Sequence, residues 1–139
     1  MLSSKTQTIL IVTPDADAES AVKTALAGAP RITVRQRAAT AEEGPEEGVP
    51  DLVIADFDDI SKAELELIEK VRAEFRNTPM IVVSDELGDA QVRRLFRLQI
   101  TDWLRKPLDQ SGLMEAIAAS VQVTQATGNP VHAVISSIG

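Results

Sequence analysis

The sequence predicts an α/β protein built on a doubly wound, five-stranded parallel sheet. Short apolar runs typical of strands buried on both faces alternate with segments whose apolar residues recur at helical spacing. Parallel neighbours need crossover connections, which helices supply, so the alternation favours one sheet with helices on both faces. With 139 residues, 44% of them hydrophobic, the chain suits a single compact domain.

The first part of the chain predicts two strands and one clear helix. Thr8–Val12 is a buried strand that Pro14 ends, and Ile32–Arg35 alternates in the manner of an edge strand. The acidic stretch Thr40–Gly48 contains two glycines and a proline, so it allows only a short or frayed second helix. Between the two strands, apolar residues at helical spacing predict a first helix that ends near Gly28: Ala18, Ala21, Val22, Ala25 and Leu26.

Three further strands and three helices complete the pattern. Ser61 and Glu64 have the spacing of a capping box, which predicts a helix start. The strands are Leu52–Ala55, Pro79–Ser84 and Asp102–Lys106. The helical segments run from Leu65 to Phe75, around Val92 to Phe96, and from Leu113 to Thr124. The predicted domain covers residues 6–126, and residues 127–139 form a linker and a strand-like segment, either an extended tail or the start of a domain that this sequence does not contain.

Composition disfavours several classes of function. A net charge of -7 is unfavourable for nucleic-acid or anionic-lipid binding, and the chain has no cysteine for a disulfide or thiolate site. No apolar run approaches the roughly 20 residues of a membrane span, and Met1–Gln7 is not a signal sequence. We therefore expect a cytoplasmic protein without a membrane span. An enzyme is disfavoured because no glycine-rich phosphate loop follows the first strand and the one histidine, His132, lies outside the core pattern.

Three polar residues close predicted strands on the edge where sites of such sheets lie: Asp56, Ser84 and Lys106. A carboxylate and an ammonium brought together there can form a phosphoryl-transfer site, with the carboxylate as nucleophile and the lysine neutralising the incoming oxygens. They can equally form a structural ion pair. The residue types alone leave both interpretations open.

This ordered set, with Lys106 followed by Pro107, resembles the CheY-like receiver domain of response regulators over residues 6 to 126. The resemblance implies a sheet of strand order 2-1-3-4-5, with Asp56 as phosphoacceptor and a histidine kinase or phosphotransfer protein as partner. It also implies that the Ser84 hydroxyl bonds a phosphoryl oxygen and that Lys106 pairs with the acyl phosphate. Trp103 falls where the family keeps an aromatic switch residue, although plain packing would also explain it.

The chain departs from the family at the metal site. Receivers carry two adjacent acidic residues after the first strand to hold Mg²⁺, and this place is Thr13-Pro14 here. The remaining candidate metal ligands are Asp15, Asp56 and Asp58, with Asp17 as a further substitute, and such a site would bind Mg²⁺ weakly. Asp15 is also placed to cap the first helix.

Two functional hypotheses follow from the resemblance. One is a phosphorelay switch that acts through Asp56, and the other is a phosphorylation-independent interaction or localisation module. The Thr13-Pro14 replacement favours the second, whereas the set Asp56, Ser84 and Lys106 favours the first. The tail, Val131–Gly139, refines the second hypothesis, because a strand-like segment after the domain resembles the arrangement in CpaE/TadZ-type pilus-assembly proteins, where a MinD-like ATPase follows an atypical receiver. In both cases we expect a protein partner or a homodimer through the helix around Val92 to Phe96, the strand Asp102–Lys106 and the last helix. Basic residues gather there: Arg93, Arg94, Arg97, Arg105 and Lys106.

Overall fold

The structure is a computed structural model that describes residues 7–14, 20–27, 32–38 and 49–127, with side chains to residue 120. Its strands are β1 (Gln7–Thr13), β2 (Ile32–Ala38), β3 (Leu52–Asp56), β4 (Met80–Ser84) and β5 (Asp102–Arg105). Its helices are α1 (Ala21–Leu26), α2 (Lys62–Glu74), α3 (Asp89–Arg97) and α4 (Gln110–Thr127). The strands form one parallel sheet of order β2-β1-β3-β4-β5, which confirms the predicted fold class and strand order.

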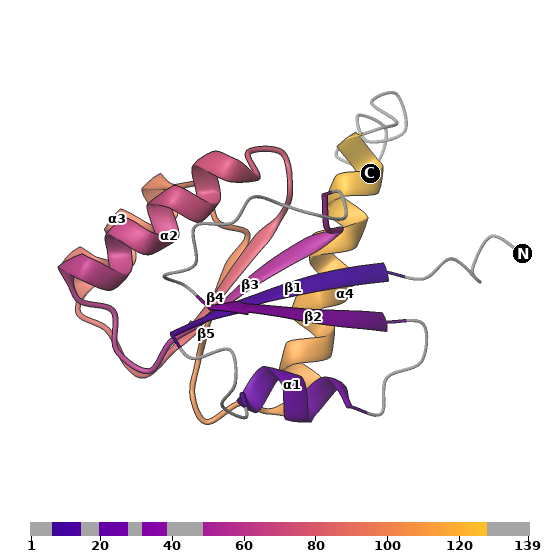
Figure 1. The fold of residues 1–139 in the computed structure, drawn as a ribbon, viewed down its shortest axis with the longest axis horizontal. Helices are drawn as coiled ribbons and strands as arrows, with labels where there is room; N and C mark the ends of the chain where they lie inside the picture. Colours follow the sequence, from indigo (N-terminus) through magenta and orange to yellow (C-terminus); the bar gives the residue numbers. More distant parts are fainter. Residues whose placement is uncertain (1–6, 15–19, 28–31, 39–48, 128–139) are drawn as a thin grey trace, which may run out of the picture.

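Helices cover both faces of the sheet, with α2 and α3 on one face and α1 and α4 on the other (Figure 1). Successive strand residues point to opposite faces, so each central strand contributes to two cores. In β1, Leu10 and Val12 join the core under α2 and α3, whereas Ile9 and Ile11 join the core under α1 and α4. This two-sided burial explains why the strands appear in the sequence as continuous apolar runs.

The start of the first helix differs from the prediction. Helix α1 begins at Ala21, and its N-cap is Ser20, whose hydroxyl oxygen accepts hydrogen bonds from the backbone N–H groups of Val22 at 3.0 Å and Lys23 at 3.3 Å. Asp15 is therefore not the cap of this helix. The predicted second helix at residues 40–48 and the strand-like tail after residue 127 lie outside the described residues and stay predictions.

The edge strand β2 is joined to α2 by an arginine clamp. Arg37 donates two hydrogen bonds to the carboxylate of Glu74, from Nη2 at 2.8 Å and Nη1 at 3.1 Å. Its guanidinium carbon also lies 5.7 Å from the centroid of the Phe75 ring. Such a bidentate pair over an aromatic ring fixes the position of the strand relative to the helix.

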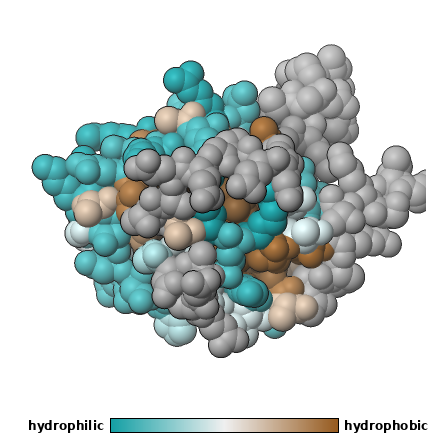
Figure 2. All heavy atoms as spheres, in the orientation of Figure 1, coloured by the Kyte–Doolittle hydropathy of each residue, from teal (hydrophilic) through white to brown (hydrophobic). Residues whose placement is uncertain are grey.

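The exterior over α2, on the face seen in Figure 2, is largely hydrophilic. Within the described residues, no helix is long and apolar enough to cross a membrane. The register places the carboxyl ends of the central strands side by side: Asp56 pairs with Val83, and Ser84 pairs with Arg105. The predicted strand-end residues therefore lie on one edge of the sheet.

The capping box at the start of α2 is the local feature that the sequence predicts most directly. Glu64 accepts hydrogen bonds from the Ser61 hydroxyl and, at 3.0 Å, from the Ser61 backbone N–H. We expect Ser61→Ala to lower the free energy of unfolding by about 1 kcal/mol, because the first turn of the helix loses its cap. Urea denaturation measures the change. Lys62→Ala, at the neighbouring exposed position, should have a much smaller effect, and equal losses in both variants would contradict the assignment.

Candidate functional site

Asp56, at the carboxyl end of β3, is a buried carboxylate with both oxygens engaged. Its residue exposure is 3%. Oδ1 lies 2.8 Å from Nζ of Lys106 in an ion pair. Oδ2 accepts a hydrogen bond from the hydroxyl of Ser20. A charge removed from water in this way needs such compensation, because an unpaired buried carboxylate is strongly destabilising.

Lys106 pairs with two carboxylates at once. Its Nζ lies 2.8 Å from Oδ1 of Asp56 and donates a hydrogen bond of 2.7 Å to Oδ1 of Asp58. Burial alone would lower the pKa of Lys106, but the hydrogen bonds and charges of the two carboxylates outweigh it and raise the pKa above its ordinary value. Asp58 is largely exposed at 84%, so the bridge runs from the interior to the surface.

Ser20 connects the start of α1 to this ion pair. Its oxygen accepts hydrogen bonds from the backbone N–H groups of Val22 and Lys23, while its hydroxyl donates one to Asp56. The Ser20 side chain therefore both caps helix α1 and hydrogen-bonds to the Asp56 carboxylate. Ser20 is itself buried, at 6% exposure. Ser20, Asp56 and Lys106, which we call the corner, therefore join α1, β3 and the loop after β5.

The Ser84 hydroxyl is committed to neighbours other than Asp56. Its Oγ accepts a hydrogen bond of 3.0 Å from the indole Nε1 of Trp103 and donates one of 2.8 Å to the backbone oxygen of Asp85. Ser84 is fully buried. Trp103 is therefore held by a specific polar contact as well as by packing, and the bond couples β5 to the end of β4.

The loop after Asp56 is fixed by burial at two positions. Phe57 and Ile60 are each 1% exposed and belong to the core under α2 and α3. The backbone oxygen of Asp58 accepts from the N–H of Asp85 at 2.8 Å, and the Gln91 side chain donates to the backbone oxygen of Ile60. This loop thus presents Asp58 to Lys106 on a rigid base.

The described residues include two of the candidate metal ligands, Asp56 and Asp58. They contain no group of three side chains of the kind that holds a metal ion. Asp56 and Asp58 supply two carboxylates, but the ammonium of Lys106 lies against both and already offsets their charge. After β1, Thr13 is buried and Pro14 is exposed, and neither provides a carboxylate. Asp15 and Asp17, the other candidate ligands, lie outside the described residues, so their part in a site stays a prediction.

The structure thus brings most of the predicted site residues together, but in a different set of contacts. Asp56 and Lys106 pair directly, whereas Ser84 bonds to Trp103 and Asp85. Sequence reasoning missed Ser20. The available signal was a serine immediately before the stripe Ala21, Val22, Ala25 and Leu26, which is a typical helix cap.

Comparisons with known proteins identify the same fold in solved structures. A response regulator CheY-like protein from Mesorhizobium loti is 31% identical, with a TM-score of 0.65, and the match covers 84% of this chain and 99% of that one. A protein from Sinorhizobium meliloti 1021 assigned as the CpaE2 pilus assembly protein is 25% identical, with a TM-score of 0.60 and coverages of 80% and 97%. A CheY-like receiver domain protein from Methanospirillum hungatei has a TM-score of 0.70 at 23% identity, with coverages of 88% and 99%. No protein-family model matches the chain, and no curated protein does.

Removal of the lysine should show how strongly the corner depends on it. In Lys106→Met, Asp56 remains buried without its cation, so we expect the free energy of unfolding to fall by about 3 kcal/mol. The adjacent Arg105→Met is a matched control, because Arg105 is exposed and its distance to Glu86 is 3.9 Å. That variant should lose less than about 1 kcal/mol. Similar losses in the two variants, measured by chemical denaturation, would contradict a structural role for the Lys106 pairs.

The raised pKa of Lys106 predicts how this stabilisation depends on pH. The lysine contribution is complete below the unfolded-state pKa of about 10.4 and is lost as the pH rises through the higher pKa of the folded state. The difference in unfolding free energy between wild type and Lys106→Met should therefore be constant from about pH 8.5 to about pH 9.5 and shrink at higher pH. The chain has no tyrosine or cysteine, which removes two other groups that titrate in this window. A difference that stays constant through pH 12, on the order of two units above the lysine reference value, would count against this account.

Proposed function

This chain belongs to the CheY-like family of response-regulator receiver domains, and from that premise we propose that it acts as a protein-interaction module that does not depend on phosphorylation. In this proposal Asp56 is a structural residue. It holds the sheet edge, the start of α1 and the loop after β5 in one arrangement, which a partner protein recognises.

The proposal rests on the environment of the Asp56 carboxylate, which is buried and has a partner at each oxygen. Phosphoryl transfer requires a carboxylate oxygen to approach phosphorus in line, with room and positive charge for the phosphoryl oxygens. Here the carboxylate is buried, Ser20 donates to one oxygen, and Lys106 lies against the other. The lysine charge is already shared with Asp58, so less of it remains to offset an incoming phosphoryl group.

A pilus-assembly setting is the second part of the proposal. The similarity to the Sinorhizobium protein assigned as CpaE2 supports it, at 25% identity over 97% of that chain. A constitutive module suits an assembly protein, because the bound arrangement then persists without a kinase. The partner in this setting would be another protein of the assembly machinery.

A phosphorelay receiver is the alternative function, and one observation favours it: Asp56, Ser84 and Lys106 lie at three neighbouring strand ends. In that reaction an Asp56 oxygen forms a bond to phosphorus, the P–N bond to the donor histidine breaks, and the imidazole keeps the electron pair. For this the Ser20 hydroxyl must leave Oδ2, and the Ser84 hydroxyl must turn from the backbone oxygen of Asp85 toward the phosphoryl group.

Chemical phosphorylation separates the two functions. We expect wild-type protein incubated with Mg²⁺ and acetyl phosphate to show no base-labile mass gain, and beryllofluoride to leave the fluorescence of Trp103, the sole tryptophan, unchanged. A typical receiver treated in parallel shows that the reagents work. A base-labile mass gain in wild type that is absent from Asp56→Asn would overturn the proposal in favour of the phosphorelay.

A further inference from the structure

Helix α1 is short and is held at both ends by polar side chains. Its six residues are fewer than a helix needs to be stable alone, so it depends on its caps and on the burial of its apolar side chains. Ser20 caps its start. Near its end, the Gln110 side chain donates a hydrogen bond of 3.2 Å to the backbone oxygen of Ala25. A change at either contact therefore acts on a helix with little stability of its own.

The Ser20 hydroxyl can keep its present contacts only while Asp56 accepts a hydrogen bond from it. A hydroxyl has one proton and two lone pairs. The proton goes to Oδ2 of Asp56, which leaves the lone pairs to accept from the backbone N–H groups of Val22 and Lys23. Ser20 and Asp56 are both buried, so solvent does not readily replace a lost partner. The charge of Asp56 thus supports the cap of α1.

An amide in place of the Asp56 carboxylate would reverse the demand on Ser20. An asparagine side chain has one accepting oxygen and a donating NH2 group. The ammonium of Lys106, which lies 2.8 Å from Oδ1, would hold the oxygen, because a charged donor binds more strongly than a hydroxyl. The NH2 group would then face the Ser20 hydroxyl and compete with the helix N–H groups for its lone pairs. Loss of the charge of Asp56 should therefore loosen the first turn of α1.

The Ser84 hydroxyl does not relay such a change to Trp103. Within the part of the chain that the structure describes, the Ser84 side chain makes no hydrogen bond to Asp56. Its hydroxyl donates to the backbone oxygen of Asp85, and its oxygen accepts from the indole of Trp103. The backbone N–H of Lys106 donates to the backbone oxygen of Ser84 at 2.8 Å, so the Lys106 side chain can change partners while its backbone stays fixed to β4.

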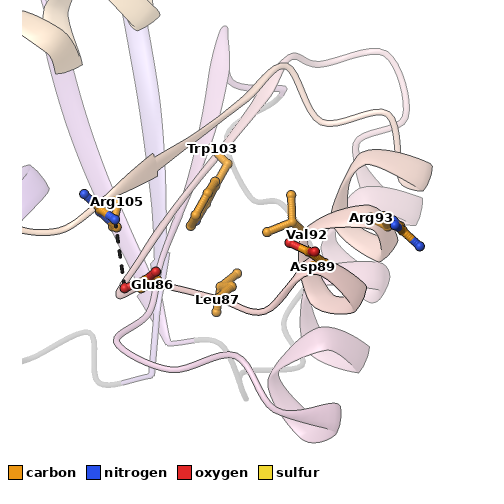
Figure 3. A pocket seen from close by; sticks show the side chains of 7 residues that line it. All are labelled: Glu86, Leu87, Asp89, Val92, Arg93, Trp103 and Arg105. Atoms are coloured by element: carbon orange, nitrogen blue, oxygen red, sulfur yellow. Dashed lines mark ion pairs between the residues drawn. The ribbon is translucent and has the colours of Figure 1, made fainter.

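The surroundings of the Trp103 ring also exclude Asp56. In Figure 3 the ring projects from β5 into a hollow of about 550 Å³, toward Leu87 of the loop after β4 and Val92 of α3. The residues that line this hollow come from these three elements, and Asp56 is not among them. The indole is therefore a reporter that should stay silent when only the charge of Asp56 changes.

We propose that the Ser20–Asp56 hydrogen bond is a conformational device, which transmits a change in the charge of Asp56 to the start of α1 and not to Trp103. Neutralisation of the carboxylate releases the first turn, while Gln110 keeps the last turn in place. Because coupling between two sites is reciprocal, a partner that holds the capped start of α1 also favours the charged form of Asp56. This inference goes beyond the proposed function, because it holds whether or not Asp56 is phosphorylated.

Amide hydrogen exchange followed by NMR tests the transmission. We expect Asp56→Asn to speed exchange in the first turn of α1, residues 22–24, at least about fivefold, with a smaller effect at Leu26. The amides of α2 serve as the reference, because they report any change in overall stability. The indole signal of Trp103 should keep its wild-type position. Unchanged exchange in α1, or a displaced indole signal, would overturn the proposal.

Asp58→Asn is the matched control. It makes the same chemical change at the other carboxylate of Lys106, but the Ser20 hydroxyl donates to Asp56 and not to Asp58, so exchange in α1 should match wild type. Ser84→Ala is the opposite control, because it removes the acceptor of the indole and should move that signal without changing α1. A thermal melt verifies that each variant folds. Equal acceleration of α1 in Asp58→Asn and Asp56→Asn would refute a role for the Ser20 bond.

The double variant isolates the bond itself. In Ser20→Ala the cap is already lost, so α1 exchanges faster, and the added change Asp56→Asn should have no further effect there. Additive effects of the two changes would place the transmission elsewhere and overturn the inference.

A second measurement leaves Asp56 in place, so it does not depend on the folding of Asp56→Asn. The carboxyl carbon signal of Asp56 should shift in Ser20→Ala, which removes its donor. It should keep its position in Ser61→Ala, which removes the serine cap of α2. An Asp56 signal that is the same in Ser20→Ala and wild type would contradict the coupling.

The outcomes for this inference and for the proposed function are separate. Labelling of Asp56 by acetyl phosphate would overturn the proposed function and leave the device standing. Unchanged exchange of α1 in Asp56→Asn would overturn the device and leave the proposed function standing.

Discussion

The arrangement of the site depends on one interaction, the ammonium of Lys106 lying between the carboxylates of Asp56 and Asp58. Asp56 ends a strand that is buried along its full length, so its charge can remain only where a cation and a hydrogen-bond donor meet it. Lys106 supplies the cation from the loop after β5, and Ser20 supplies the donor from the start of α1. The same contacts that compensate the buried charge of Asp56 also shield its carboxylate from solvent.

The fold was predictable from the sequence because its strands and helix starts are specified by residues that lie close together in the chain. Strands buried on both faces appear as continuous apolar runs, and the capping box before α2 fixes a helix start from two residues. The pairing of Asp56 with Lys106 was also accessible, since parallel strands bring their carboxyl ends to one edge. The partners of Ser84 and the bond from Ser20 to Asp56 were not, because a hydroxyl can donate to any oxygen within reach and only the packed structure selects one.

The fold of this chain and the polar contacts at its sheet edge depend on different sets of residues. The sheet and its two cores are maintained by apolar residues distributed along the whole chain, whereas the chemistry of the edge rests on a few side chains. Thr13-Pro14, which supply no carboxylate at the end of β1, are therefore compatible with an intact fold. Membership of the family establishes the architecture, and the contacts of Asp56 then favour a structural role for it.

The long sequence separation within the corner has a consequence for synthesis of the protein. The Ser20–Asp56 bond and the Asp58–Lys106 bond span 36 and 48 residues. During translation β3 emerges well before the loop after β5, so Asp56 must stay hydrated until Lys106 has left the ribosome. Closure of the sheet edge is thereby postponed to the last part of the chain. A nascent chain arrested after β4 and before Lys106 would leave β4 as an exposed sheet edge, because β5 is its outer neighbour, and an exposed apolar edge strand is open to pairing with other chains.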